Sequence, residues 1–157
     1  MTIQVDFEHG VKAVHDAMTD PKYLIDRNLA LGEISAEYDV AEENDGTTIT
    51  AVRELRRDLP GLLAKLFDSV SVMDMTENWL EKGDGWTGEW SLQVREQPVS
   101  VTGRFELAPT STGCSYTVSH QARAKIPFMS GQIEKFILGQ TANGARNELE
   151  HLKNYLD

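Results

Sequence analysis

The sequence contains a single cysteine, Cys114, among its 157 residues. One thiol cannot form an internal disulfide framework, and its isolation fits a reducing cytoplasm. No stretch approaches the ~20 consecutive apolar residues of a membrane-spanning helix. The first residues, MTIQVDFEHG, lack the basic and then apolar order of a secretory signal. We therefore predict a cytoplasmic protein with no integral membrane association.

Positive charge is also scarce. Lys and Arg number 15 against 25 Asp and Glu, which gives a formal net charge of −10. A surface this acidic repels phosphate backbones and anionic lipid head groups. The one basic cluster, Arg53, Arg56 and Arg57, is interrupted by Glu54 and Asp58, so we interpret it as a solvated strand end. We expect no nucleic-acid partner.

Common catalytic and metal-binding motifs are missing. The sequence has no G-x-S-x-G elbow, no Walker loop and no G-x-G-x-x-G fingerprint. Its four histidines, His9, His15, His120 and His151, do not show the spacing of metal ligands. We therefore expect neither a metal site nor a cofactor.

The longest regular segment lies near the C-terminal end, from about Phe128 to Tyr155, and contains no proline. A helix of this length would run roughly 40 Å. One broad side of it is mainly apolar: Ile133, Ile137, Ala145, Leu149, Leu152 and Tyr155. The middle of that side is small, with Thr141, Gly144 and Ala145, and Gly139 lies on the flank. Because each glycine costs a helix about 1 kcal/mol relative to alanine, we predict that small size leaves room for a cavity.

Alternation with a period of two dominates the rest of the chain. Residues 3–7 form a first predicted strand, and two short helices follow, the second beginning at Asp20-Pro21 and running to about Ala30. Asn44-Asp45-Gly46 predicts a hairpin turn. Further strands are predicted over 33–40, 47–57, 69–81, 86–95, 99–107 and 114–124.

The segment 69–81 does not alternate cleanly. Val70 and Val72 share one parity, whereas Met73, Met75 and Trp79 share the other. A β-bulge would bring both sets to the buried face, and we predict one here.

The order of elements is a strand, two short helices, a meander of about six strands and a long C-terminal helix. This order resembles the helix-grip fold of the START and Bet v 1-like (SRPBCC) superfamily over essentially the whole chain. The stretches DPKYL, RELRRDLPGLLAKLF and WTGEW resemble a bacterial branch of unknown function that is related to polyketide cyclases and lipid carriers.

The resemblance implies an α+β fold in a single domain spanning residues 1–157. About seven antiparallel strands would curve around the C-terminal helix and enclose an apolar cavity. The superfamily includes carriers, receptors, cyclases and interaction modules, so the fold implies no particular activity. Plant members carry a glycine-rich loop where this chain has EENDG, so no phosphate-binding role is transferred to residues 42–46.

Two inward polar residues are candidates for chemistry. His120 shares its parity with Tyr116 and Val118, and it would act as a general base or orient a ligand. The alternative is a core histidine hydrogen-bonded to the backbone or to Tyr116. Glu148 lies on the inner side of the helix, where its pKa would be raised and it would pair with His120 or an arginine. Alternatively, it lies where the sheet splays apart and water reaches it.

The predicted cavity wall combines aromatic residues of the sheet with small residues of the helix. Such a wall suits a lipid, an isoprenoid or a polyketide-like ligand, although the same aromatic residues also suit a packed core. The wall comprises Tyr38, Trp79, Trp86, Trp90, Phe105, Tyr116, His120, Ile137, Thr141, Gly144, Ala145 and Glu148.

Three functions remain open at this point. The one we expect is binding or transport of a small hydrophobic ligand, without catalysis. The second is a cyclase or dehydratase in which His120, with Glu148 or Tyr116, moves protons. The third is an interaction module with a closed core, which would contact itself or a partner through an apolar cluster. That cluster, which would otherwise cover the cavity mouth, comprises Leu62, Leu63, Leu66 and Phe67.

Overall fold

Seven strands form one antiparallel sheet in the computed structural model, which describes residues 1–157. The strands are β1 Thr2–Phe7, β2 Ser35–Glu43, β3 Gly46–Arg56, β4 Val70–Lys82, β5 Gly85–Val94, β6 Val99–Pro109 and β7 Cys114–Ala124. Their spatial order is β1-β7-β6-β5-β4-β3-β2, so β2 to β7 form a meander and β1 pairs with the far edge of β7.

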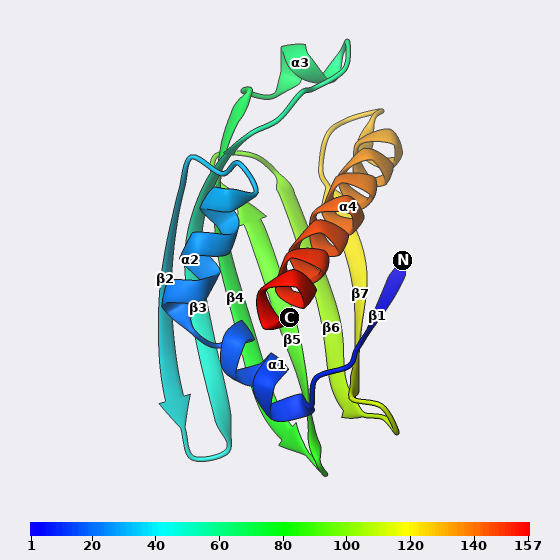
Figure 1. Cartoon of the computed structure of the whole chain (residues 1–157). Coiled ribbons are helices and arrows are strands. Elements are labelled where there is room, and N and C mark those ends of the chain that lie inside the picture. Colours follow the sequence, from blue (N-terminus) through cyan, green and yellow to red (C-terminus); the bar gives the residue numbers. More distant parts are fainter.

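Three helices cover the same face of this curved sheet (Figure 1). They are α1 Val11–Met18, α2 Pro21–Ala30 and the 27-residue α4 Ser130–Leu156. A single turn, α3 Leu63–Leu66, lies in the connection between β3 and β4. The predicted α+β helix-grip fold, with two short helices after the first strand, is confirmed.

Local sequence signals determine two of the connections. Asp20 caps α2, because its Oδ1 atom accepts a hydrogen bond of 3.0 Å from the backbone N–H of Lys22, and Pro21 occupies the first turn. Asn44 and Asp45 form the two-residue turn between β2 and β3, whose register pairs Glu43 with Gly46. Both predicted signals are confirmed.

The buried residues form two clusters along α4. The larger cluster includes Val14 of α1, Tyr23 of α2, Trp79, Phe105 and Leu152. The smaller cluster surrounds the N-terminal half of α4 and includes the buried residues Met73, Leu92, Val101, Ile133 and Ile137. The long helix is therefore held by apolar contacts at both ends of its inner face.

The predicted β-bulge in β4 is wrong. The pairing of β3 with β4 runs without interruption from Arg56 opposite Val70 to Gly46 opposite Leu80. Met73, Met75 and Trp79 are buried, and Val70 and Val72 point to the other face. Apolar and polar residues do not alternate cleanly in this segment because the inner face of β4 also includes the polar residues Ser71 and Glu77. These two residues line a cavity and are not part of a packed core.

Candidate functional site

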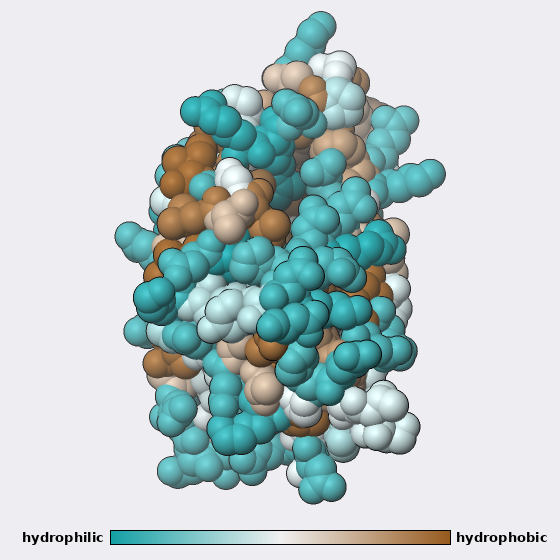
Figure 2. Space-filling view, in the orientation of Figure 1, coloured by the Kyte–Doolittle hydropathy of each residue, from teal (hydrophilic) through white to brown (hydrophobic).

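A cavity of about 400 Å³ lies between the sheet and α4. Of its 35 lining residues, 20 are hydrophobic, so most of its wall suits an apolar molecule. Leu31, just after α2, belongs to the wall and is 42% exposed, which places it where the cavity reaches the surface. Apolar side chains gather beside this upper end of α2 in the space-filling view (Figure 2). Leu29 and Ile34 are exposed near it in the sequence.

Most of the predicted wall surrounds this cavity. Both candidates of β7, Tyr116 and His120, line it, as does Trp90 of β5. The remaining members of the predicted wall that line it belong to α4: Ile137, Thr141, Gly144, Ala145 and Glu148.

Four predicted wall residues lie elsewhere. Trp79 and Phe105 pack against each other in the larger core cluster, with ring centroids 4.5 Å apart. Trp86 stacks on His15 of α1 at 3.9 Å. Tyr38 joins a polar network described below. Alternation along the strands predicted that these side chains point inward. It could not predict that α1 and α2 cover this part of the sheet, because that depends on tertiary packing.

Gly144 faces open space. A Cβ atom built at this position would meet no heavy atom within 4 Å, and Gly144 lines the cavity. The glycine therefore leaves volume free and is not required for close packing. Gly139, five residues earlier in α4, also has free space around it but does not belong to the cavity wall.

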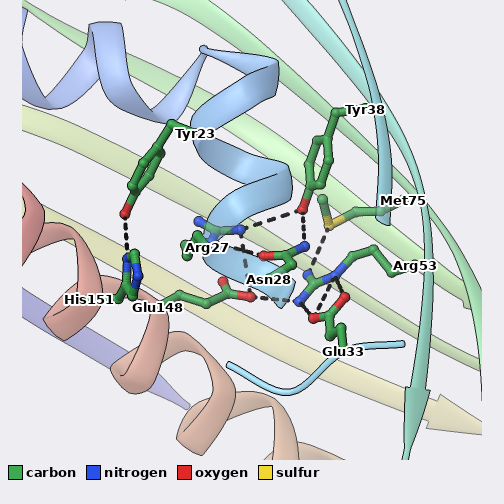
Figure 3. Close-up of polar contacts among 9 residues, drawn as sticks. All are labelled: Tyr23, Arg27, Asn28, Glu33, Tyr38, Arg53, Met75, Glu148 and His151. Carbon is green, nitrogen blue, oxygen red and sulfur yellow. Dashed lines mark hydrogen bonds and ion pairs between the residues drawn. The ribbon is translucent and has the colours of Figure 1, made fainter. Parts of the chain in front are cut away.

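A network of charged side chains lies in the cavity wall, and Figure 3 shows its contacts. Arg53 of β3 donates from Nη2 to Oε1 of Glu148 at 2.6 Å, and Nη2 of Arg27 lies 3.7 Å from the same oxygen. Arg53 also donates to Glu33, with 3.1 Å between Nε and Oε1. The network therefore joins α2, β3 and α4.

Polar groups of α2 and β2 complete the network. Arg27 donates from Nε to Oδ1 of Asn28 at 2.9 Å, and Nδ2 of Asn28 donates to the hydroxyl of Tyr38 at 2.7 Å. Asn28 is fully buried, so these bonds satisfy groups that water does not reach. Tyr38 also accepts a hydrogen bond of 3.4 Å from Nη2 of Arg27, so it helps to hold that arginine.

Two interpretations of charged residues are corrected by this network. Arg53 is not part of a solvated strand end: its side chain is 12% exposed and shares the inward parity of Ile49 and Ala51. The pKa of Glu148 is lowered, whereas a raised value was predicted. Burial alone would raise this pKa, but the positive charges of Arg27 and Arg53 outweigh burial. Among the predicted partners of Glu148, an arginine is the one found.

His120 forms neither a hydrogen bond nor an ion pair with Glu148, whose partners are Arg53 and Arg27. The imidazole is 2% exposed, and its edge packs against Trp90 with ring centroids 5.5 Å apart. Its Nδ1 atom is buried and has no hydrogen-bond partner, so the predicted hydrogen bond to the backbone or to Tyr116 is not made by this atom. Burial lowers the pKa of His120, and the positively charged N-terminus adds to this effect. Both effects favour the neutral form of the imidazole.

Several site residues escaped the sequence analysis. Glu77 of β4 lines the cavity and accepts a hydrogen bond of 3.0 Å from Nε1 of Trp79. Burial raises the pKa of its carboxyl group. Its parity with Met75 and Trp79 is the signal that could have identified it. Arg27 and Glu33 carry no such signal, because both depend on how α2 packs.

The apolar cluster around α3 is divided between the cavity and solvent. Leu63 and Phe67 line the cavity, whereas Leu62 and Leu66 are exposed. The cluster therefore contributes to one end of the cavity wall and also presents an apolar outer surface.

Residues 2–156 match the family described as "Protein of unknown function (DUF2505)". The chain belongs to this DUF2505 family. No curated protein has a sequence detectably similar to that of this DUF2505 protein. No helix in its structure is both long and apolar enough to cross a membrane.

Solved structures of similar fold come from several bacteria. An uncharacterised Rhizobium leguminosarum protein has a TM-score of 0.63 and 11% identity, covering 99% of this chain and 92% of its own. Protein MLL2253 from Mesorhizobium loti has a TM-score of 0.59 and 16% identity, covering 100% and 96%. Protein CV1439 from Chromobacterium violaceum has a TM-score of 0.53 and 15% identity, and the match covers 99% of this chain and 94% of that protein. At these identities the likeness concerns the fold alone.

Proposed function

We propose that this DUF2505 protein binds or transports a small hydrophobic ligand, such as a lipid, an isoprenoid or a polyketide-like molecule, in the cavity between the sheet and α4. The observation that carries the proposal is the free volume at Gly144 in a mainly hydrophobic wall. Protein interiors are usually packed without voids of this size. A volume of about 400 Å³ also lies within the range of roughly 300–1,000 Å³ that is typical of small-molecule sites.

The resemblance to the START and Bet v 1-like superfamily supports the same proposal, since its carriers hold ligands between the sheet and the C-terminal helix. The glycine adds an energetic argument. Gly144 costs α4 about 1 kcal/mol relative to alanine, and no neighbouring atom requires the absence of a side chain. Retaining free volume for a ligand accounts for that cost.

A cavity-filling substitution tests the proposal with Nile red, a neutral apolar probe. The wild type should bind the dye saturably, and Gly144→Met should weaken binding about tenfold, because forcing a side chain into a filled site costs about 1–3 kcal/mol. Gly139→Met is the matched control: it adds the same side chain to the same helix outside the cavity wall. Its dye affinity should equal that of the wild type.

Both variants should melt at a slightly higher temperature than the wild type, since methionine is the better helix former by nearly 1 kcal/mol. This shared shift shows that each variant folds. Nile red binding that is absent in the wild type, or equal in Gly144→Met and Gly139→Met, would contradict binding in this cavity.

A cyclase or dehydratase is the second candidate, favoured by His120. Its Nδ1 atom is buried without a partner, its lowered pKa favours the unprotonated form that a general base needs, and Tyr116 lines the same cavity. An enzyme without this base would retain unconverted substrate. We therefore expect wild type and His120→Ala to co-purify with the same small molecule if the protein is a carrier. A different extracted mass in His120→Ala, measured by mass spectrometry, would favour the enzyme.

A further inference from the structure

The charges in the cavity wall do not balance. Three glutamates line it, Glu33, Glu77 and Glu148, against four arginines. The arginines are Arg27, Arg53, Arg56 and Arg57. The wall is therefore positive in a protein whose formal net charge is −10.

Each of the three carboxylates already has a hydrogen-bond partner within the protein. Glu33 and Glu148 accept hydrogen bonds from Arg53, and Glu148 also forms the ion pair with Arg27. Glu77 accepts from Trp79, and burial favours its neutral form. Arg56 extends to solvent, where water solvates its charge. This leaves one arginine of the wall with no carboxylate.

That arginine is Arg57, immediately after β3. Its Nε atom is buried and has no hydrogen-bond partner, and its Nη2 atom lies 3.2 Å from the sulfur of Met73, a weak acceptor. Burial lowers the pKa of Arg57 and repulsion by Arg53 adds to the effect, while the more distant carboxylate of Glu33, which forms no ion pair with it, opposes them only in part. Arg57 as a whole is half-buried, and its guanidinium makes no ion pair, so an anion reaching it from the cavity would find free N–H donors.

The surroundings of Arg57 define the rest of the ligand. Leu55, Leu63, Phe67 and Met73 line the same cavity, and its wall continues along the inner face of α4. An anion at Arg57 would therefore have an apolar chain or ring system attached to it. A planar carboxylate suits the fork of N–H donors that a guanidinium presents.

We infer that the ligand is an amphipathic acid: its carboxylate pairs with Arg57 and its apolar body occupies the cavity toward Gly144. This inference rests on the proposed function and adds the chemical class of the ligand. The opposite orientation, with the acid at the Arg27–Arg53 pair, is disfavoured because Glu148 and Glu33 already occupy those donors.

Matched ten-carbon probes test the inference by isothermal titration calorimetry at pH 7.5. Decanoate should bind the wild type at least about tenfold more tightly than decanol, which is the difference expected for a charge-assisted hydrogen bond. Arg57→Gln should abolish this preference and leave decanol binding unchanged. Arg123→Gln, which alters an exposed arginine of β7 outside the cavity, should keep it.

The outcomes separate the two proposals. Equal affinities of the wild type for decanoate and decanol, or a preference for decanoate that survives in Arg57→Gln, would overturn the amphipathic acid and leave an apolar ligand in place. Failure of the wild type to bind either probe would overturn both proposals. Because Arg57 makes no ion pair that supports the fold, Arg57→Gln should melt at or above the wild-type temperature.

Discussion

Replacing Glu148 with alanine should lower the free energy of unfolding by about 3–5 kcal/mol, the usual cost of removing one partner from a buried ion pair. The side chain of Arg27 is 7% exposed, and Glu148 is the carboxylate with which it pairs. Without Glu148 the Arg27 guanidinium would remain buried with only neutral partners. Since domains are stable by only about 5–15 kcal/mol, much of the total would be lost. Urea unfolding followed by circular dichroism measures the change.

Glu150→Ala is the matched control, because it removes an exposed glutamate from the same helix two residues away. It should change stability by no more than about 0.5 kcal/mol. Equal effects of Glu148→Ala and Glu150→Ala would show that the network contributes nothing to stability.

The same comparison has a pH dependence. The pKa of Glu148 in the folded protein is below its ordinary value of 4.5. Its contribution is therefore fully present above the pKa of the unfolded chain, and it is lost as the pH falls through the folded-state value. The stability difference between wild type and Glu148→Ala should be constant from neutral pH to about 5 and shrink below about 4.5.

Gly103→Val should lower the free energy of unfolding by about 3 kcal/mol or more, which is the upper end of the effects of overpacking. Gly103 of β6 lies in register between Trp90 of β5 and His120 of β7. A Cβ atom at this position would lie 2.1 Å from the backbone oxygen of Ser119 and 2.3 Å from Nε1 of Trp90. Neither the sheet backbone nor an indole in the cavity wall can yield this space at low cost.

The neighbouring Thr102→Val is the control for Gly103→Val, since Thr102 is exposed on the opposite face of the same strand. Valine and threonine both favour strands, so Thr102→Val should be nearly neutral. A Gly103→Val variant as stable as Thr102→Val in urea would mean that the indole does not lie over this glycine.

The sequence predicted the elements of the fold because their signals are local. Alternation in β5, β6 and β7 follows from one face being buried, and the Asp20 cap and the Asn44-Asp45 turn depend on a few adjacent residues. Alternation failed as a guide in β4, where Glu77 occupies an inward position. A cavity wall tolerates polar residues that a packed core excludes, so the pattern weakens where a site is present.

The candidate site was predicted in part. The difference between the features that were predicted and those that were not has a physical origin. The inward positions of His120, Tyr116 and Gly144 follow from the periods of a strand and a helix. The free space around Gly144 and the unpaired Nδ1 of His120 depend on neighbours far away in the sequence. Periodicity gives the direction of a side chain but not the partner that it meets.

Local residue patterns predict the order of strands and helices, the inner face of each strand other than β4, and the small residues on α4. Which inward residues meet a ligand-sized space depends instead on how the helices pack on the sheet. The packing of α1 over Trp79 and Trp86 filled one end of the sheet, and the packing of α2 brought Arg27 to Glu148. It also left Arg57 without an anion. These outcomes depend on distances between elements, which no local pattern of residues encodes.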